Sequence, residues 1–386
     1  MIKVAKPYVT EREVEAIREV LFSGRYLTGP KVEEFEQKFA DYIGVEHSVA
    51  VNSGTAALHV SLAVLGVGPG DEVIVPPLTF FSTVSSVLHQ NAIPVFGDID
   101  PDSYCLDPED VKKRITENTK AIIPVHLFGN AANMEELLRV AKENDLYVIE
   151  DAAQAHGTEY KGEKVGSIGD IGTFSFYATK HMTTGEGGML VTDNGEWAKL
   201  ARNIRSHGMT DRDHHDYLGY NYRMNEIAAA MGIVQLERLD DLNEKRIKNS
   251  KYLLGRLREL KIPWLTTPRL ESRVKHTFFW CPVLIDEKKL GMGTKRLREK
   301  LYERGIETRH RYHNPLYKQK VLTEKNPYPE GFPYNSKHYD KNIDYQQVYL
   351  ETAEKVAGKL LGLPNHPGLG QTELDAVIDS IRSLEV

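Results

Sequence analysis

The sequence predicts an α/β fold with a large, mixed but mostly parallel sheet domain and a smaller C-terminal α+β domain. Short apolar runs rich in β-branched residues alternate with helical patterns through the first half of the chain, and this rhythm is typical of parallel sheets. The 386 residues are enough for two hydrophobic cores. Because the alternation loosens near residue 245, we expect a large domain over 1–244 and a small domain over 245–386.

Hydrophobic periodicity gives the expected elements of the large domain. Val32, Phe35 and Phe39 recur at helical spacing within 31–42, which predicts an amphipathic helix. Apolar runs predict strands at 47–52, 72–76, 93–99, 121–127, 146–150 and 173–177, with helices at 54–65, 109–115, 134–143 and 195–204.

The second half is expected to begin with a long charged helix from about Leu242. A strand is expected at 278–285 because Phe, Trp, Val and Ile cluster there. Helices are expected at 294–304, 346–361 and 372–383.

Composition limits the classes of protein to consider. A hydrophobic content of 41% and a charged content of 27% are typical of a globular enzyme. The net charge of −6, without a basic tract, argues against nucleic acid as a partner. Cys105 and Cys281 are the two cysteines, which suggests a reducing compartment. No apolar run approaches about 18 residues and the N-terminus is too charged for a signal peptide, so a cytoplasmic location without a membrane partner is expected.

An acid and a lysine follow two neighbouring apolar runs. Asp151 comes directly after the run 146–150, at the edge where ligands collect in open α/β sheets. Lys180 follows the run 173–177. A lysine amine that forms a Schiff base, with a carboxylate that keeps the pyridine nitrogen protonated, is the pair that pyridoxal 5'-phosphate (PLP) requires.

The residues around this pair resemble those of the DegT/DnrJ/EryC1/StrS family of PLP-dependent nucleotide-sugar aminotransferases. The matching segments read EDAAQAHG, SFYATK and TTGEGG. The resemblance implies the aspartate-aminotransferase-like fold, called fold type I. It also implies that Asp151 is the partner of the ring nitrogen, Gln154 lies near the ring hydroxyl, Ser175 binds the phosphate and Lys180 carries the cofactor.

Three further segments match the same family. The segment NSGTAAL joins a strand to a helix N-terminus, where free N–H groups favour an anion. Gly54 and Thr55 would hold the cofactor phosphate there. Phe80 would stack on the pyridine ring, with Phe81 as the competing candidate. Asn221, in GYNYRM, would reach the phosphate of a neighbouring subunit, which implies a homodimer with shared active sites.

Two residues of the expected small domain are candidates for the substrate pocket. Tyr312 and His313 lie in the segment RHRYHNPLY. His310 and His313 have the spacing of a pair of metal ligands, but no third ligand is evident, so no metal is expected.

The resemblance implies a transaminase that converts a nucleotide-linked keto-sugar to an amino-sugar, with glutamate as the amino donor. Family members that act at sugar C4 tend to carry Tyr and TTGEGG at the positions of Tyr222 and 183–188. We therefore expect a 4-keto-6-deoxy sugar as substrate and a 4-amino-4,6-dideoxy sugar as product.

Alternative functions differ in substrate or in class. A sugar 3-aminotransferase and a cyclitol aminotransferase would use the same site. The dehydratase branch carries histidine in place of the lysine, and Lys180 argues against it. A non-enzymatic regulatory protein is the alternative from another class, and such a protein need not bind the cofactor covalently.

Overall fold

A computed structural model describes residues 1–339 and 341–384 of the chain. A seven-stranded sheet forms its centre, in the order β1-β9-β8-β5-β4-β2-β3. The strands are β1 (His47–Val51), β9 (Gly188–Thr192), β8 (Ile171–Ser175), β5 (Tyr147–Asp151), β4 (Thr119–Ile122), β2 (Glu72–Val75) and β3 (Ile93–Phe96).

Five neighbouring strands of this sheet, from β8 to β3, run parallel, whereas β9 is antiparallel to both β8 and β1. The strands are short and almost fully buried, as expected for a sheet covered by helices. The parallel strands therefore end at a common edge, and Asp151 is the last residue of β5. The sheet is mixed and mostly parallel, as predicted.

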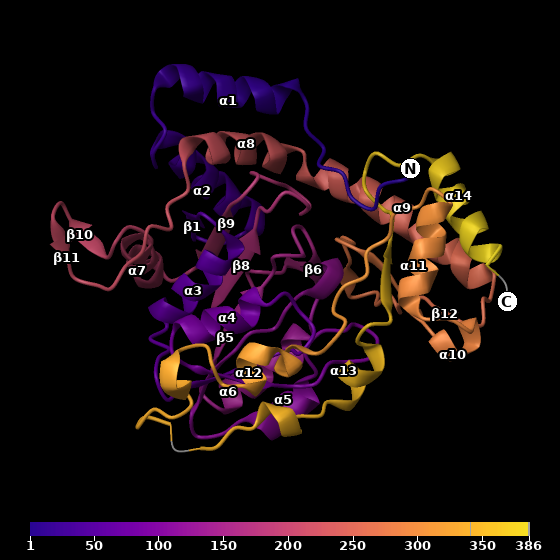
Figure 1. Cartoon of the computed structure of the whole chain (residues 1–386). Helices are drawn as coiled ribbons and strands as arrows, with labels where there is room; N and C mark the ends of the chain where they lie inside the picture. The colour runs from indigo at the N-terminus through magenta and orange to yellow at the C-terminus, as the bar shows by residue number, and fades with distance from the viewer. Residues whose placement is uncertain (340, 385–386) are drawn as a thin grey trace.

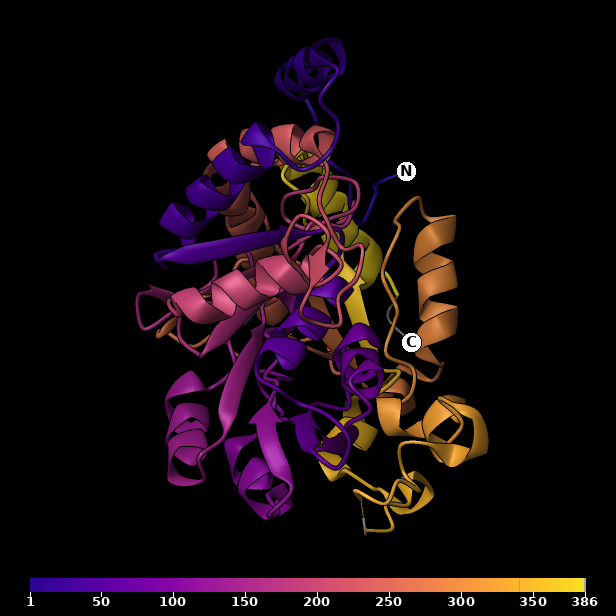
Figure 2. The same cartoon turned by 90° about the vertical axis from the view of Figure 1, so that its left-hand side faces the viewer.

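Helices cover the sheet and connect its strands (Figures 1 and 2). The predicted amphipathic helix is α2 (Pro30–Ile43), and its Phe35 and Phe39 pack edge-on or tilted against Phe176. The other helices of this part are α1 (Glu11–Ser23), α3 (Gly54–Val64), α4 (Ser82–His89), α5 (Pro108–Arg114), α6 (Met134–Glu143), α7 (Gly195–Arg205), α8 (Glu226–Glu237) and α9 (Leu239–Glu259).

A second hydrophobic core lies around the end of α9. Leu253 and Leu257 of this helix pack with Phe278 and Val283, and Ile378 closes the core from the C-terminal helix. The elements here are β12 (Leu265–Thr266), β14 (Cys281–Ile285), α10 (Glu287–Leu290), α11 (Thr294–Glu303), β15 (Leu360–Leu363) and α14 (Gln371–Arg382). The predicted boundary between residues 244 and 245 lies inside α9 and stays a prediction.

A segment in the second half of the chain packs against the large core and not against the second one. Residues between Leu316 and Leu360 contribute buried side chains to the large core. Leu316 donates its N–H to the carbonyl of Pro77, and the Tyr345 hydroxyl donates to the carbonyl of Pro94 at 2.7 Å. In Figure 1, α12 (Lys320–Thr323) and α13 (Glu351–Val356) lie at the bottom of the body, away from α14.

The helix expected over 346–361 is wrong. This stretch forms a 3-10 turn at Tyr345–Gln347, the short helix α13 and the strand β15. The apolar positions serve two different cores, since Leu350 and Val356 pack into the large one and Leu361 and Leu363 into the second. A single continuous helix could not reach both.

Candidate active site

Asp151 is buried at the carboxyl edge of the sheet, with 5% of its surface exposed. Its Oδ2 accepts a hydrogen bond from the hydroxyl of Thr83 in α4 at 2.9 Å. Its Oδ1 accepts one from the backbone N–H of Ala153 at 3.2 Å. Two donors from different elements therefore fix the orientation of this carboxylate.

Burial raises the pKa of Asp151 above its usual range, because the charged carboxylate loses solvation. The hydrogen bonds from Thr83 and Ala153 and the positive charge of Lys180 act in the opposite direction. A cationic group placed against Asp151 would further stabilise its charged form. The site therefore suits a ligand with a protonated nitrogen.

Lys180 lies in a turn after β8, where its backbone N–H donates to the carbonyl of Tyr177 at 2.9 Å. The side chain is half-buried, and its amine lies 4.7 Å from the centroid of the Phe279 ring. Phe279 comes from the segment that leads into β14, so the second half of the chain forms one wall beside the amine.

Burial lowers the pKa of Lys180 to about 8, because the ammonium form loses solvation. The charge of Asp151 raises this pKa, whereas the charges of Arg309 and Arg311 lower it. A substantial fraction of the amine is neutral near pH 8. Such an amine can act as a nucleophile or as a base.

The predicted phosphate-binding turn lies between β1 and α3. Ser53 caps α3 by accepting a hydrogen bond from the N–H of Ala56 at 3.1 Å. Within the described residues, the N–H groups of Gly54 and Thr55 make no hydrogen bond. These two free donors, together with the helix dipole, form a ready anion site.

Gly54 lies directly against Ser175 at the end of β8. A Cβ added to Gly54 would lie 2.7 Å from the Cβ of Ser175, so only glycine fits at this contact. The Thr55 hydroxyl shares a hydrogen bond of 2.7 Å with Ser82, the first residue of α4. The structure thus brings Gly54, Thr55 and Ser175 together, as the family resemblance implies.

Phe80 and Phe81 face different surroundings. Phe80 is 60% exposed, whereas Phe81 is partly buried and packs against the large core. Of these two rings, that of Phe80 is therefore the one that is free to cover a ligand.

Gln154 links the sheet edge to the second half of the chain. Its Oε1 accepts a hydrogen bond from the N–H of Phe128 at 3.2 Å, and its Nε2 donates to the Tyr312 hydroxyl at 3.1 Å. Tyr312 therefore joins the group, but the exposed His313 does not. The ring of His313 meets that of His310 edge-on, with centroids 4.3 Å apart.

Asn221 is exposed and lies beside the predicted phosphate-binding turn of its own chain. Its carbonyl accepts a hydrogen bond from Asn52 Nδ2 at 3.2 Å, and the N–H of Asn52 donates to the carbonyl of Tyr222. The described residues provide no hydrogen-bond partner for the Asn221 side chain. That side chain is free to bind a ligand or a second subunit.

Sequence reasoning missed three side chains near Lys180 and Asp151. Thr83 was missed because its role depends on a contact with Asp151, 68 positions away. Phe279 and Arg309 were missed for the same reason, since they approach the lysine only after the second half has folded back. The guanidinium of Arg309 lies 5.3 Å from the Phe279 ring centroid, on the ring that Lys180 also contacts.

Arg309 has no ionic partner within the described part of the chain. Its backbone is fixed by two hydrogen bonds to Gly362 of β15, at 2.9 and 2.8 Å. Its guanidinium lies over Phe279 and Trp280, and burial lowers its pKa to about 10, so it is charged at neutral pH. The Arg309 guanidinium is thus fixed in place, has no ionic partner among the described residues and lies near the Lys180 amine. Such a cation is suited to bind a carboxylate or a phosphate of a ligand.

His126 and Glu150 form a buried pair next to Asp151, with His126 Nε2 2.8 Å from Glu150 Oε2. Burial by itself would raise the pKa of Glu150, but the hydrogen bonds from His126 and from backbone N–H groups lower it overall. Glu150 also accepts from the N–H groups of Gly166, Ile168 and Gly169. The pair braces the loop after β5 and does not face a ligand site.

The side chains present fit PLP. The free N–H groups at the start of α3 suit its phosphate, the buried carboxylate of Asp151 suits its ring nitrogen, and the amine of Lys180 suits its aldehyde. Phe80 offers an exposed ring for stacking. In the described residues, no group of three or more His, Cys, Asp or Glu side chains could hold a metal ion.

Comparisons with known proteins agree with this chemistry. A sequence profile of the DegT/DnrJ/EryC1/StrS aminotransferase family matches residues 7–341. GDP-perosamine synthase of Caulobacter vibrioides is 37% identical over 98% of this chain and 97% of that protein. The spore coat polysaccharide biosynthesis protein SpsC of Bacillus subtilis is 36% identical over 98% of this chain and 95% of that protein.

The chain is also similar to solved structures of aminotransferases over nearly its whole length. DesV of S. venezuelae matches with a TM-score of 0.86 at 34% identity and covers 97% of this chain and 95% of that chain. NtdA of Bacillus subtilis, solved with the bound cofactor PMP, matches with a TM-score of 0.85 at 29% identity, over 97% of this chain and 82% of that chain. No helix in the described residues is long and apolar enough to cross a membrane.

Proposed function

Because the chain belongs to the DegT/DnrJ/EryC1/StrS aminotransferase family, whose members are PLP-dependent sugar transaminases, we propose that it aminates C4 of a nucleotide-linked 4-keto-6-deoxy sugar. Glutamate is the proposed amino donor, and a 4-amino-4,6-dideoxy sugar is the product. The similarity to GDP-perosamine synthases, at 37% and 35% identity over nearly the whole chain, is the observation that carries the choice of C4.

Each residue at the sheet edge has a proposed role in this reaction. Bound PLP supplies an aldehyde that takes up the amino group and a ring that accepts electrons. Lys180 would hold the cofactor through its amine, and the free amine would take the proton from the donor α-carbon. Asp151 would hold the proton on the ring nitrogen, and Gln154 would bind near the ring hydroxyl.

The remaining residues position the cofactor. Gly54, Thr55 and Ser175 surround the proposed phosphate position, and Phe80 covers the ring. The pKa of about 8 at Lys180 leaves enough neutral amine for proton transfer near that pH. Tyr312, which accepts a hydrogen bond from Gln154, is the proposed contact of the sugar.

A panel of keto-substrates tests the proposed function. We expect turnover with a nucleotide-linked 4-keto-6-deoxy sugar at least about tenfold faster, as kcat/KM, than with the matching 3-keto sugar or a keto-cyclitol. Product analysis by NMR would locate the new amine on C4. Faster turnover of a 3-keto sugar or a cyclitol would replace the substrate assignment, and no turnover with any ketone would favour the regulatory alternative.

Arg309 is the proposed partner of the donor carboxylate. Replacing it with methionine keeps an unbranched apolar stem but removes the charged guanidinium, so the KM for glutamate should rise roughly 10- to 100-fold. The exposed Arg298 is a matched control, and its replacement with methionine should leave this KM unchanged. An unchanged glutamate KM in the Arg309 variant would assign the donor carboxylate to another group.

We further propose that the enzyme is a homodimer with shared sites. Phe22 and Leu27, at the end of α1 and just after it, are 86% and 78% exposed, and Leu218 near the hairpin of β10 (Met209–Asp211) and β11 (His214–His215) is 81% exposed. Figures 1 and 2 show α1 projecting from the top of the body, and Figure 1 shows the hairpin projecting beside α7. Apolar side chains on projecting segments favour a covering partner, and a second copy is the proposed one.

Hybrid dimers test whether Asn221 reaches across to the neighbour. Homodimers of Lys180→Ala and of Asn221→Ala are each expected to be inactive or severely impaired. If Asn221 acts across the interface, one site of a hybrid combines an intact Lys180 with an intact Asn221. Activity should therefore return after the two variants are dissociated together and reassembled.

A second pairing provides the control. Lys180 and Asp151 lie in the same chain and serve the same site, so hybrids of Lys180→Ala with Asp151→Asn should recover no activity. Differently tagged chains that co-purify would show that hybrids had formed. Hybrids of the first pair without activity would place the contact of Asn221 within its own chain, beside Asn52.

A further inference from the structure

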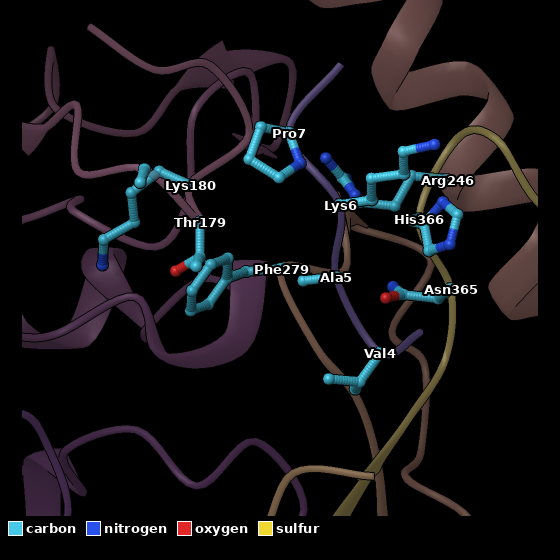
Figure 3. A pocket seen from close by; sticks show the side chains of 11 residues that line it. Val4, Ala5, Lys6, Pro7, Thr179, Lys180, Arg246, Phe279, Asn365 and His366 are labelled. Atoms are coloured by element: carbon cyan, nitrogen blue, oxygen red, sulfur yellow. The ribbon is translucent and has the colours of Figure 1, made fainter. Parts of the chain in front are cut away.

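A small cavity lies behind the turn that carries Lys180. It has a volume of about 20 Å³ and is lined by the N-terminal segment 4–7, the turn 178–180, Arg246 of α9, Phe279, Asn365 and His366. Figure 3 shows Lys6, Arg246, Asn365 and His366 gathered on one side, whereas the Lys180 side chain extends away from them. In this view the Lys180 amine points away from these four polar groups.

Arg246 is the unusual member of this lining. It is 92% buried, since only 8% of its surface is exposed, and its Nε is buried without a hydrogen-bond partner. No hydrogen bond or ion pair reaches its guanidinium from the described residues. Arg205, which is equally buried, instead pairs with Glu36 and donates to the carbonyl of Ala50.

A buried guanidinium without a counter-ion is costly, because its charge loses solvation and gains no replacement. Burial and the charge of Arg309 lower the pKa of Arg246 only to about 10, so the group stays charged at neutral pH. None of the residues that line the cavity is acidic. The missing negative charge must come from outside this group of residues.

The other polar groups of the lining are also mostly donors. Lys6 carries an ammonium group. His366 Nδ1 accepts a hydrogen bond from the N–H of Gly368 at 3.2 Å, so the proton of the neutral ring lies on Nε2. Asn365 Nδ2 is already engaged, since it donates to Ser250 and to the carbonyl of Phe278.

We propose that Arg246, with Lys6 and His366, binds a small inorganic anion of the chloride type in this cavity. A cavity needs roughly 10–15 Å³ to hold one water molecule. The cavity volume of about 20 Å³ therefore suits a monoatomic ion and is too small for a nucleotide or a sugar. The anion would supply the missing counter-charge. It would also tie the N-terminal segment to α9 and to the residues that follow β15.

Bromide offers a direct test, because it replaces chloride and scatters anomalously. Crystals of the holoenzyme grown without halide and soaked in sodium bromide should show an anomalous peak within hydrogen-bonding distance of the Arg246 guanidinium. A cavity that holds only water, or a carboxylate from a second copy of the chain, would overturn the proposal.

Thermal unfolding gives an independent readout that does not depend on activity. At constant ionic strength, replacing sodium gluconate with sodium chloride should raise the Tm of the holoenzyme by about 2 °C or more, with saturation. Arg246→Met should abolish this response, whereas Arg256→Met, on an exposed position of the same helix, should keep it.

An equal chloride response in wild type and Arg246→Met would contradict the proposal. If Arg246→Met does not fold, Lys6→Met, at an exposed position, replaces it and should weaken the chloride response. The bromide experiment on the wild type decides the question in either case.

Discussion

Replacing Asp151 with asparagine should lower kcat about a thousandfold or more while the cofactor stays bound. Asparagine has nearly the same shape and keeps an oxygen for the hydrogen bond from Thr83 or Ala153. It lacks the negative charge that is proposed to hold the proton on the ring nitrogen. Electrostatic groups of this kind account for losses of this order when they are removed.

Steady-state kinetics and the cofactor content of the purified variant measure this effect. Asp170 offers a matched control, since it lies directly before β8, at the opposite end of the sheet, and accepts a hydrogen bond from the N–H of Val148. Asp170→Asn should keep near-normal turnover. Near-normal turnover of Asp151→Asn would mean that another group faces the ring nitrogen.

Replacing Lys180 with alanine should lower turnover by about ten-thousandfold or more and abolish covalent attachment of the cofactor. The change removes the amine that is proposed to act both as nucleophile and as proton carrier. Lys245→Ala, at an exposed position of α9, should retain activity. Mass spectrometry of the intact protein and steady-state assays would detect both effects.

The pH dependence of PLP attachment follows from the lowered pKa of Lys180. Only the neutral amine reacts with an aldehyde, and the pKa of Lys180 is lowered to about 8. Attachment of PLP to the apoprotein should therefore accelerate as the pH rises through about 8. A rate that keeps rising up to pH 10 would indicate an unperturbed lysine.

Sequence reasoning was most successful where a local pattern decides the outcome. The alternation of apolar runs and helices predicted the mixed, mostly parallel sheet, and the family, the transaminase class and PLP as cofactor are confirmed. The turn before α3 and the strand ends at Asp151 and Ser175 are local features, and the structure brings them together. Their catalytic roles stay proposals.

The features that could not be predicted from the sequence depend on contacts between distant parts of the chain. The buried tyrosines Tyr317 and Tyr345 return to the large core, although their segment is irregular in sequence. The loose pattern of 346–361 looked like one helix because its apolar residues serve two cores. Arg309 and Arg246 could not be singled out, because an unpaired arginine is defined by the absence of neighbours that only a folded structure reveals.

Reduction of the purified holoenzyme with borohydride, followed by peptide mapping, tests whether Lys180 is the residue that carries the cofactor. Borohydride makes the link between the cofactor and its lysine permanent. We expect a yellow protein and a single labelled peptide in which Lys180 carries the cofactor. A label on another lysine, or no label on a protein that has been saturated with PLP, would contradict the assignment of Lys180.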